Sequence, residues 1–104
     1  MNVADEHSVS STISKIMEQH KKIDVVVNAA GITGKTGIKT EHVELSDFNN
    51  VMSINVTGIF LMCKYTIPHM RHANYGRIIN IASISGKGMP VFYRCVIEYY
   101  RQIY

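Results

Sequence analysis

Residues 23–31 read Ile-Asp-Val-Val-Val-Asn-Ala-Ala-Gly, a short β-branched run that stops at small residues. An almost continuous apolar run of this length is typical of a strand that is buried on both faces in a parallel sheet. Asn28 and the small residues after it have turn-forming potential, so the strand should stop there. We therefore predict a strand over residues 23–27, followed by a turn over residues 28–31.

The segment before this strand has the pattern of an amphipathic helix. Asp5 is a good N-cap residue, and the negative charge of Glu6 suits the first turn of a helix. We predict a helix over roughly residues 6–21, which ends near the positive charges of Lys21 and Lys22. The residues that recur at helical spacing are Val9, Ile13, Ile16, Met17 and His20.

A loop and a longer helix should follow the strand. Residues 31–45 contain glycines among threonines and lysines, and a structureless stretch of that length is usually functional or mobile. Ser46 is a candidate N-cap, Pro68 should end or kink the helix, and residues 69–75 should return the chain to the sheet. The expected apolar stripe consists of Phe48, Met52, Ile59 and Cys63, flanked by Val51, Phe60, Met62, Ile67 and Met70.

A second strand is expected over residues 76–82, which read Gly-Arg-Ile-Ile-Asn-Ile-Ala, and residues 83–88 form the segment after it. The order helix, strand, helix, strand implies a parallel sheet with right-handed crossovers. No repeat, low-complexity stretch or internal domain boundary interrupts this order. The predicted fold class is therefore α/β, a partial Rossmann-like parallel sheet with flanking helices.

The carboxyl ends of the two strands are where an open parallel sheet binds its ligand. Residues 28–31 and residues 83–86 occupy those ends. Their small side chains would let a flat ligand approach the backbone closely. The alternative is that they only form tight turns between strand and loop, and without other observations this second interpretation is favoured.

Asn55 lies inside the apolar stripe of the long helix, between Phe48 and Ile59. A primary amide in such a place costs about 1–3 kcal/mol if its hydrogen bonds are not made. One interpretation is a core asparagine bonded to a nearby backbone carbonyl at a helix irregularity. The other is a polar group held at an active site, and the pattern alone does not choose between them.

Three segments together resemble the short-chain dehydrogenase/reductase family, and most of all its 3-oxoacyl-carrier-protein-reductase-like branch. Residues 28–31 resemble the family's Asn-Asn-Ala-Gly motif, with alanine at the second place. Residues 55–58, Asn-Val-Thr-Gly, resemble its active-site asparagine segment, and residues 76–83 resemble the strand that delivers its catalytic serine. The resemblance makes residues 1–88 the central part of a Rossmann-like domain, whereas residues 89–104 form a tail that does not resemble the family.

The resemblance implies NAD(P)-dependent oxidoreduction of a small-molecule carbonyl/alcohol pair. By position, Ser83 would orient the substrate and Asn55 would hold a water of the proton relay. Val3 would lie near the adenine, although Asn2 stands where the family usually has aspartate. The residues expected to line the cofactor pocket are Asn28, Ala29, Ala30 and Gly31.

Two family features have no counterpart in the sequence. The glycine-rich phosphate turn is absent, and position 96, where the tyrosine of the Tyr-x-x-x-Lys motif would fall, is Val96. No lysine follows Lys87, and Lys64 should lie on the helix face opposite Asn55. The sequence thus predicts a truncated relative that is inactive as an isolated chain. The alternative is a non-catalytic interaction or dimerisation module, because the family's long helix commonly packs across a subunit interface.

Composition excludes several other classes. The net charge is +3, but the lysines and arginines are scattered, so we expect no nucleic-acid partner. No uninterrupted apolar run of about 20 residues and no secretory signal is present, which predicts a cytoplasmic chain without a membrane partner. Cys63 and Cys95 are expected to be free thiols. His69 and His72 lack an obvious third ligand, so no metal is expected.

Overall fold

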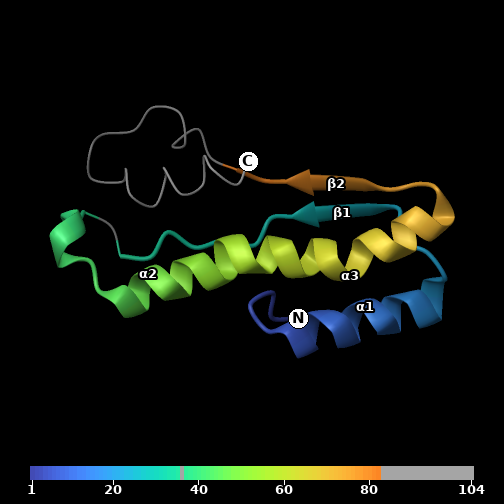
Figure 1. Ribbon diagram of the computed structural model, residues 1–104, viewed down its shortest axis with the longest axis horizontal. Helices are drawn as coiled ribbons and strands as arrows, with labels where there is room; N and C mark the ends of the chain where they lie inside the picture. Colours follow the sequence, from blue (N-terminus) through green and yellow to red (C-terminus); the bar gives the residue numbers. More distant parts are fainter. Residues whose placement is uncertain (36, 83–104) are drawn as a thin grey trace.

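The structure, a computed structural model, describes residues 1–35 and 37–82. Two parallel strands lie side by side, and a long helical segment connects them (Figure 1). This arrangement confirms the predicted partial Rossmann-like α/β fold. The elements in chain order are α1 (Glu6–His20), β1 (Val25–Asn28), η1 (Thr40–His42), α2 (Leu45–Met52), η2 (Ser53–Thr57), α3 (Gly58–Ala73) and β2 (Arg77–Asn80).

Helix α1 begins and ends as its sequence predicts. The Asp5 carboxylate accepts a hydrogen bond from the backbone N–H of Ser8 at 3.2 Å, which satisfies one of the free donors at the helix start. At the other end Lys21 adopts a left-handed conformation with φ 64°, and its N–H donates to the carbonyl of Met17. The predicted boundaries are therefore confirmed to within one residue.

Strand β1 is buried on one face only, so the prediction of burial on both faces is wrong for the described part of the chain. Val26 and Asn28 are buried, whereas Val25 and Val27 are 50% and 54% exposed. Successive side chains of a strand point to opposite faces. The described helices cover only the face that carries Val26, where the core consists of Val9, Ile13, Val26, Leu61, Met62 and Met70.

The start of the long helix differs from the prediction. It begins at Leu45, with Glu44 rather than Ser46 at the N-cap position and without a side-chain cap. A π turn, η2, then separates α2 from α3. The predicted stripe is only half-buried at Met52, Ile59 and Cys63, because the buried face lies one residue earlier along the segment. The residues that are buried along the segment are Val51, Gly58, Leu61, Met62, Thr66 and Met70.

Pro68 does not end the helix, which continues to Ala73 and is capped by Asn74 with φ 52°. The expected return to the sheet over residues 69–75 is therefore wrong, because most of these residues are helical. Proline removes one hydrogen bond from a helix interior. The flanking side chains of Thr66 and Met70 are 0% and 7% exposed, so packing on both sides of Pro68 holds the helix in place.

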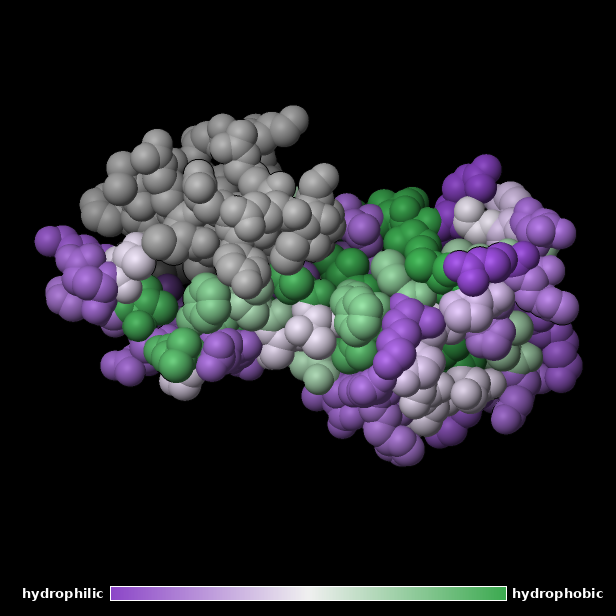
Figure 2. All heavy atoms as spheres, viewed as in Figure 1, coloured by the Kyte–Doolittle hydropathy of each residue, from purple (hydrophilic) through white to green (hydrophobic). Residues whose placement is uncertain are grey.

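The face of the sheet opposite the helices carries a group of apolar side chains, which we call the open sheet face. Its members are Val25, Val27, Ile79 and Ile81, between 48% and 59% exposed. Val27 and Ile79 are partners in the parallel register. Hydrophobic side chains gather over the strands in Figure 2, while hydrophilic side chains cover the α1 side of the molecule. Exposed apolar side chains gathered on one face of a sheet favour association.

The helical segment Leu45–Ala73 is long and apolar enough to cross a membrane by length and composition alone, with a mean hydropathy of 1.2 in its most apolar part. A core helix of a soluble protein passes the same test, so this property is weak support for a membrane span. Here the segment contributes Leu61, Met62 and Met70 to a core shared with α1 and β1.

Glu6 joins α1 to α3 through two hydrogen bonds. Its Oε1 accepts from Lys64 Nζ at 2.6 Å and from the Tyr65 hydroxyl at 2.8 Å. These bonds favour the ionised carboxylate, with that from Lys64 the larger effect, so the pKa of Glu6 lies below its usual value. The same contacts raise the pKa of Lys64 and that of Tyr65.

We expect the open sheet face to drive self-association of the 104-residue chain. Val27→Thr keeps the side-chain volume and Ile79→Thr shortens the side chain, and both reduce the apolar area, so light scattering should report smaller assemblies. The matched control is Val26→Thr, which places a hydroxyl in the core and should lower the free energy of unfolding by about 1–3 kcal/mol. A monodisperse wild-type monomer with a sharp cooperative melt would contradict this expectation.

The Glu6 contacts predict a pH dependence on both sides of neutrality. Because the folded pKa of Glu6 is lowered, its contribution to stability is complete above its unfolded value and is lost as the pH falls through the folded value. The raised pKa values of Lys64 and Tyr65 give contributions that are complete below their unfolded values and are lost at high pH. NMR titration should show Glu6 titrating below 4.5 in the wild type and nearer that value in Lys64→Met. An unchanged Glu6 pKa in the variant would count against the ion pair.

Candidate functional site

The carboxyl ends of the two strands are tied together by a pair of asparagines. Asn28 and Asn80 are register partners, and Asn28 Nδ2 donates to Asn80 Oδ1 at 2.8 Å. The backbone N–H of Ile81 donates to the carbonyl of Asn28 at 3.0 Å. Asn28 is only 8% exposed, so its side chain joins the strands at the predicted ligand-binding edge.

The small residues after β1 leave their backbone accessible. Ala29, Ala30 and Gly31 are all exposed, although they follow directly on a buried strand residue. An added Cβ at Gly31 would approach Asn55 Oδ1 at 3.4 Å, so this glycine lies beside the side chain from the long helix. The edge therefore has the two properties that a flat ligand needs there, small side chains and open backbone.

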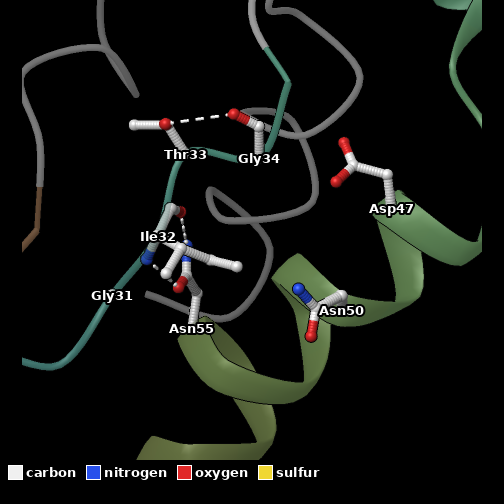
Figure 3. A pocket seen from close by; sticks show the side chains of 7 residues that line it. All are labelled: Gly31, Ile32, Thr33, Gly34, Asp47, Asn50 and Asn55. Atoms are coloured by element: carbon white, nitrogen blue, oxygen red, sulfur yellow. Dashed lines mark hydrogen bonds between the residues drawn. The ribbon is translucent and has the colours of Figure 1, made fainter.

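Asn55 uses both ends of its amide on one residue of the loop. Its Nδ2 donates to the carbonyl of Ile32 at 2.7 Å, and its Oδ1 accepts from the N–H of Ile32 at 2.8 Å (Figure 3). Asn55 itself lies in the π turn η2. The interpretation of an asparagine bonded to backbone at a helix irregularity is thus confirmed in its geometry. Because such π turns are frequent at functional sites, the two interpretations are compatible.

A second contact holds the same loop near the start of the long helical segment. Asp47 Oδ2 accepts from the backbone N–H of Lys35 at 3.0 Å. Gly34 precedes Lys35 and has a φ of 67°. A Cβ added to Gly34 would come within 2.7 Å of Val51 Cγ2 and 2.9 Å of Asp47 Oδ2. Glycine is therefore required at this position both by its backbone conformation and by its close approach to the helix.

An open depression of about 600 Å³ lies between the loop and the helix. In Figure 3 the side chains of Asp47, Asn50 and Asn55 come from the helix, and the loop forms the opposite wall. Among the residues of this lining that the structure describes, Asp47 alone has an ionisable side chain. The lining consists of Gly31, Ile32, Thr33, Gly34, Asp47, Asn50 and Asn55.

A second depression of about 580 Å³ lies where α3 leads into β2, at the opposite end of the strands. Its lining includes Arg71 and Arg77, and the guanidinium of Arg77 lies 5.0 Å from the centre of the Tyr75 ring. Its apolar lining comes from residues such as Ile67 and Met70. Among the described residues of the two linings, the positive charges are therefore at this far end.

Val3, the predicted adenine contact, is half-buried near the start of the chain. Its Cγ2 would be 2.9 Å from a Cβ added to Gly58, so it packs against the start of α3. The N-terminal residues lie on the side of α3 away from the strands in Figure 1. Asn2 caps its own turn, since its Oδ1 accepts from the N–H of Ala4 at 3.0 Å. The role of Val3 stays a prediction.

Ser83, the predicted catalytic serine, lies outside the described residues, as does the predicted tail at residues 89–104. Lys64 bonds to Glu6 on α1, and its place on the helix face opposite Asn55 stays a prediction. Among residues 1–35 and 37–82 no group of three or more His, Cys, Asp or Glu side chains could hold a metal ion.

Three residues at this edge were not predicted from the sequence: Ile32, Asp47 and Asn80. The signal for Asn80 was available, because two asparagines at the same position of two parallel strands face each other when the register is aligned. The roles of Ile32 and Asp47 depend on how closely the loop approaches the helix, and the sequence carried no comparable signal for them.

Comparison with known proteins places these features in one family. The sequence model described as short chain dehydrogenase matches residues 1–96. The 2-(R)-hydroxypropyl-CoM dehydrogenase of Xanthobacter autotrophicus is 46% identical over 85 residues, covering 81% of this chain and 34% of that protein. A 3-oxoacyl-[acyl-carrier-protein] reductase of Synechocystis is 39% identical over 85 residues, covering 82% of this chain and 34% of that protein. The chain thus spans about a third of the length of these curated relatives.

Solved structures show the same fold. ElxO with NADP bound superposes with a TM-score of 0.86 at 31% identity, over 99% of this chain and 42% of that one. NAD⁺-bound xylitol dehydrogenase superposes with a TM-score of 0.81 at 37% identity, over 88% of this chain and 35% of that one. Both of these relatives therefore carry a nicotinamide dinucleotide in their structures.

The Asn55 amide should matter for stability as well as for the shape of the edge. Asn55→Ala removes both side-chain hydrogen bonds to Ile32 and should lower the free energy of unfolding by about 1–2 kcal/mol, measured by urea denaturation. Asn50→Ala is the matched control, since the described residues give its exposed side chain no hydrogen bond, and it should change stability by less than about 0.5 kcal/mol. Equal effects of the two substitutions would show that the Ile32 bonds contribute nothing.

Proposed function

The chain belongs to the short-chain dehydrogenase family, and from this membership we propose that it forms the central part of an NAD(P)-dependent oxidoreductase that acts on a carbonyl/alcohol pair. One arrangement carries the proposal. The loop after β1, which begins with the Asn-Ala-Ala-Gly segment, is bonded through Ile32 to Asn55 of the second family segment. Two segments that resemble family motifs thus meet at the edge where parallel α/β sheets bind ligands.

The proposed roles follow from position at this edge. Ala29, Ala30 and Gly31 would contact the nicotinamide end of the cofactor through their exposed backbone. Asn28, just before these residues, would fix the end of β1 through its hydrogen bond to Asn80. When bound, NAD(P) supplies hydride exchange with the carbon of the carbonyl/alcohol pair. Val3 is proposed for the adenine end, where the dinucleotide extends away from the strand ends.

Asn55 and Ser83 complete the proposed catalytic set. Both polar atoms of the Asn55 side chain bond to Ile32. Each atom uses only one bond there, and a primary amide has a second N–H and a second lone pair. Asn55 would therefore hold the loop in place and could still bind a water of the proton relay. Ser83 would orient the substrate oxygen after β2. A small alcohol or carbonyl compound fits the names of the relatives, which include a hydroxypropyl-CoM dehydrogenase, an oxoacyl reductase and a xylitol dehydrogenase.

The 104 residues by themselves are proposed to have little or no activity. They contain no glycine-rich phosphate turn and no Tyr-x-x-x-Lys pattern. Tyrosine has an unperturbed pKa of about 10, so it needs a nearby cation to exchange protons near neutral pH. Lys64 is held by Glu6, and among residues 1–35 and 37–82 the side-chain hydrogen-bond partner of Asn55 is Ile32 rather than a lysine.

The second candidate function is a non-catalytic interaction or dimerisation module. The open sheet face favours it, together with Phe60 on α3, which is 60% exposed. Such a module would make a homo-oligomer without cofactor. Its proposed location is the cytoplasm, with no nucleic-acid partner, because the positive charges of the chain are scattered.

Titration with NAD(H) and NADP(H) separates the two candidates. We expect the 104-residue chain to bind either cofactor more weakly than the micromolar range, because the specific phosphate contacts of a glycine-rich turn are missing. Cofactor oxidation with a carbonyl substrate should be absent and unaffected by Ser83→Ala. Saturable micromolar binding, or turnover that Ser83→Ala abolishes, would overturn the expectation. Stable assembly without any cofactor binding favours the module.

A further inference from the structure

The helix holds the loop after β1 at two points, and the proposed function assigns a role to only one of them. Asn55 bonds to Ile32, and Asp47 bonds to the N–H of Lys35 at 3.0 Å, three residues farther along the loop. Both contacts come from side chains of one helical segment, eight residues apart. The loop between them forms the wall of the open depression (Figure 3).

Gly34 makes the second contact sensitive to geometry. Its φ of 67° is in the left-handed region, and it lies so close to Val51 and Asp47 that a Cβ would not fit. The N–H of Lys35 can reach Asp47 Oδ2 only while Gly34 keeps this turn. A charge-assisted bond to a carboxylate is shorter and stronger than a neutral one, so Asp47 stabilises the turn from the helix side.

We propose that Asp47 is a positioning residue of the cofactor edge. By holding Lys35 and the turn at Gly34, it fixes one end of the loop segment whose other end is fixed by Asn55. The placement of Gly31 and Ile32 between β1 and the helix then depends on Asp47 as well as on Asn55. This inference rests on the proposed function, because the segment matters for catalysis only if the nicotinamide end of a cofactor binds beside it.

A simpler role for Asp47 is to stabilise the first turn of α2, where a negative charge interacts favourably with the helix dipole. Two substitutions distinguish the roles. Asp47→Asn removes the charge but keeps an oxygen that accepts from Lys35, whereas Asp47→Ala removes both. Glu44→Gln is the matched control, because it removes a negative charge at the same helix start, where Glu44 makes no side-chain cap.

The experiment is residue-level amide hydrogen exchange by NMR on the 104-residue chain. Asp47→Ala should accelerate exchange at Lys35 and also at Ile32 by roughly threefold to tenfold, the loss expected for one hydrogen bond. Asp47→Asn should stay within about twofold of the wild type at both amides, and Glu44→Gln should leave both unchanged. Amides of α1 and β1 should keep their wild-type rates in all three variants.

Several results would overturn the proposal. Faster amide exchange at Lys35 but not at Ile32 in Asp47→Ala would show that the Asp47 bond affects only Lys35 and does not position Ile32. Equal acceleration in Asp47→Asn and Asp47→Ala would assign the effect to charge. Acceleration of every element in Asp47→Ala would make the residue a general stability determinant. The hydrogen-exchange measurement uses no cofactor. A failed cofactor titration would therefore count against the proposed function alone, and the exchange rates could still be interpreted.

Discussion

The paired hydrogen bonds between the Asn55 amide and the backbone of Ile32 determine how the two halves of this chain meet. A primary amide carries a donor and an acceptor on one carbon, so it can satisfy the N–H and the C=O of a single residue at once. The bonds of 2.7 and 2.8 Å bring the loop after β1 to the side of the long helix. Gly31, beside the amide oxygen, can approach only because it lacks a side chain.

The π turn around Asn55 lies in a helical segment whose buried face keeps its spacing across the turn. Val51 is buried before the turn, and Gly58, Met62, Thr66 and Met70 are buried after it. Intervals of seven and four residues bring side chains to one face of a helix. The predicted stripe has the same spacing, but the buried face lies one residue before Met52, Ile59 and Cys63.

Much of the fold could be predicted from local patterns. The α1 boundaries depend on Asp5 and on the charges at its end, and the parallel sheet follows from the order of elements. The failures have tertiary causes. Pro68 stays helical because its neighbours are packed, and β1 is covered on one face because the described helices lie on one side. At the site, sequence identified Asn55 and residues 28–31, whereas Asp47 depends on a loop approach that no local pattern encodes.

The proposed cofactor site is the carboxyl end of β1, and mapping NMR shift changes on adding millimolar NADP⁺ tests this placement most directly. Even very weak binding should then move the backbone amides of Ala29–Ile32 and the side-chain amide of Asn55. The competing location is the depression at the far end of the strands, where Arg71 and Arg77 would attract the phosphates. Shift changes confined to residues 71–78, with none at residues 29–32 or Asn55, would contradict the account.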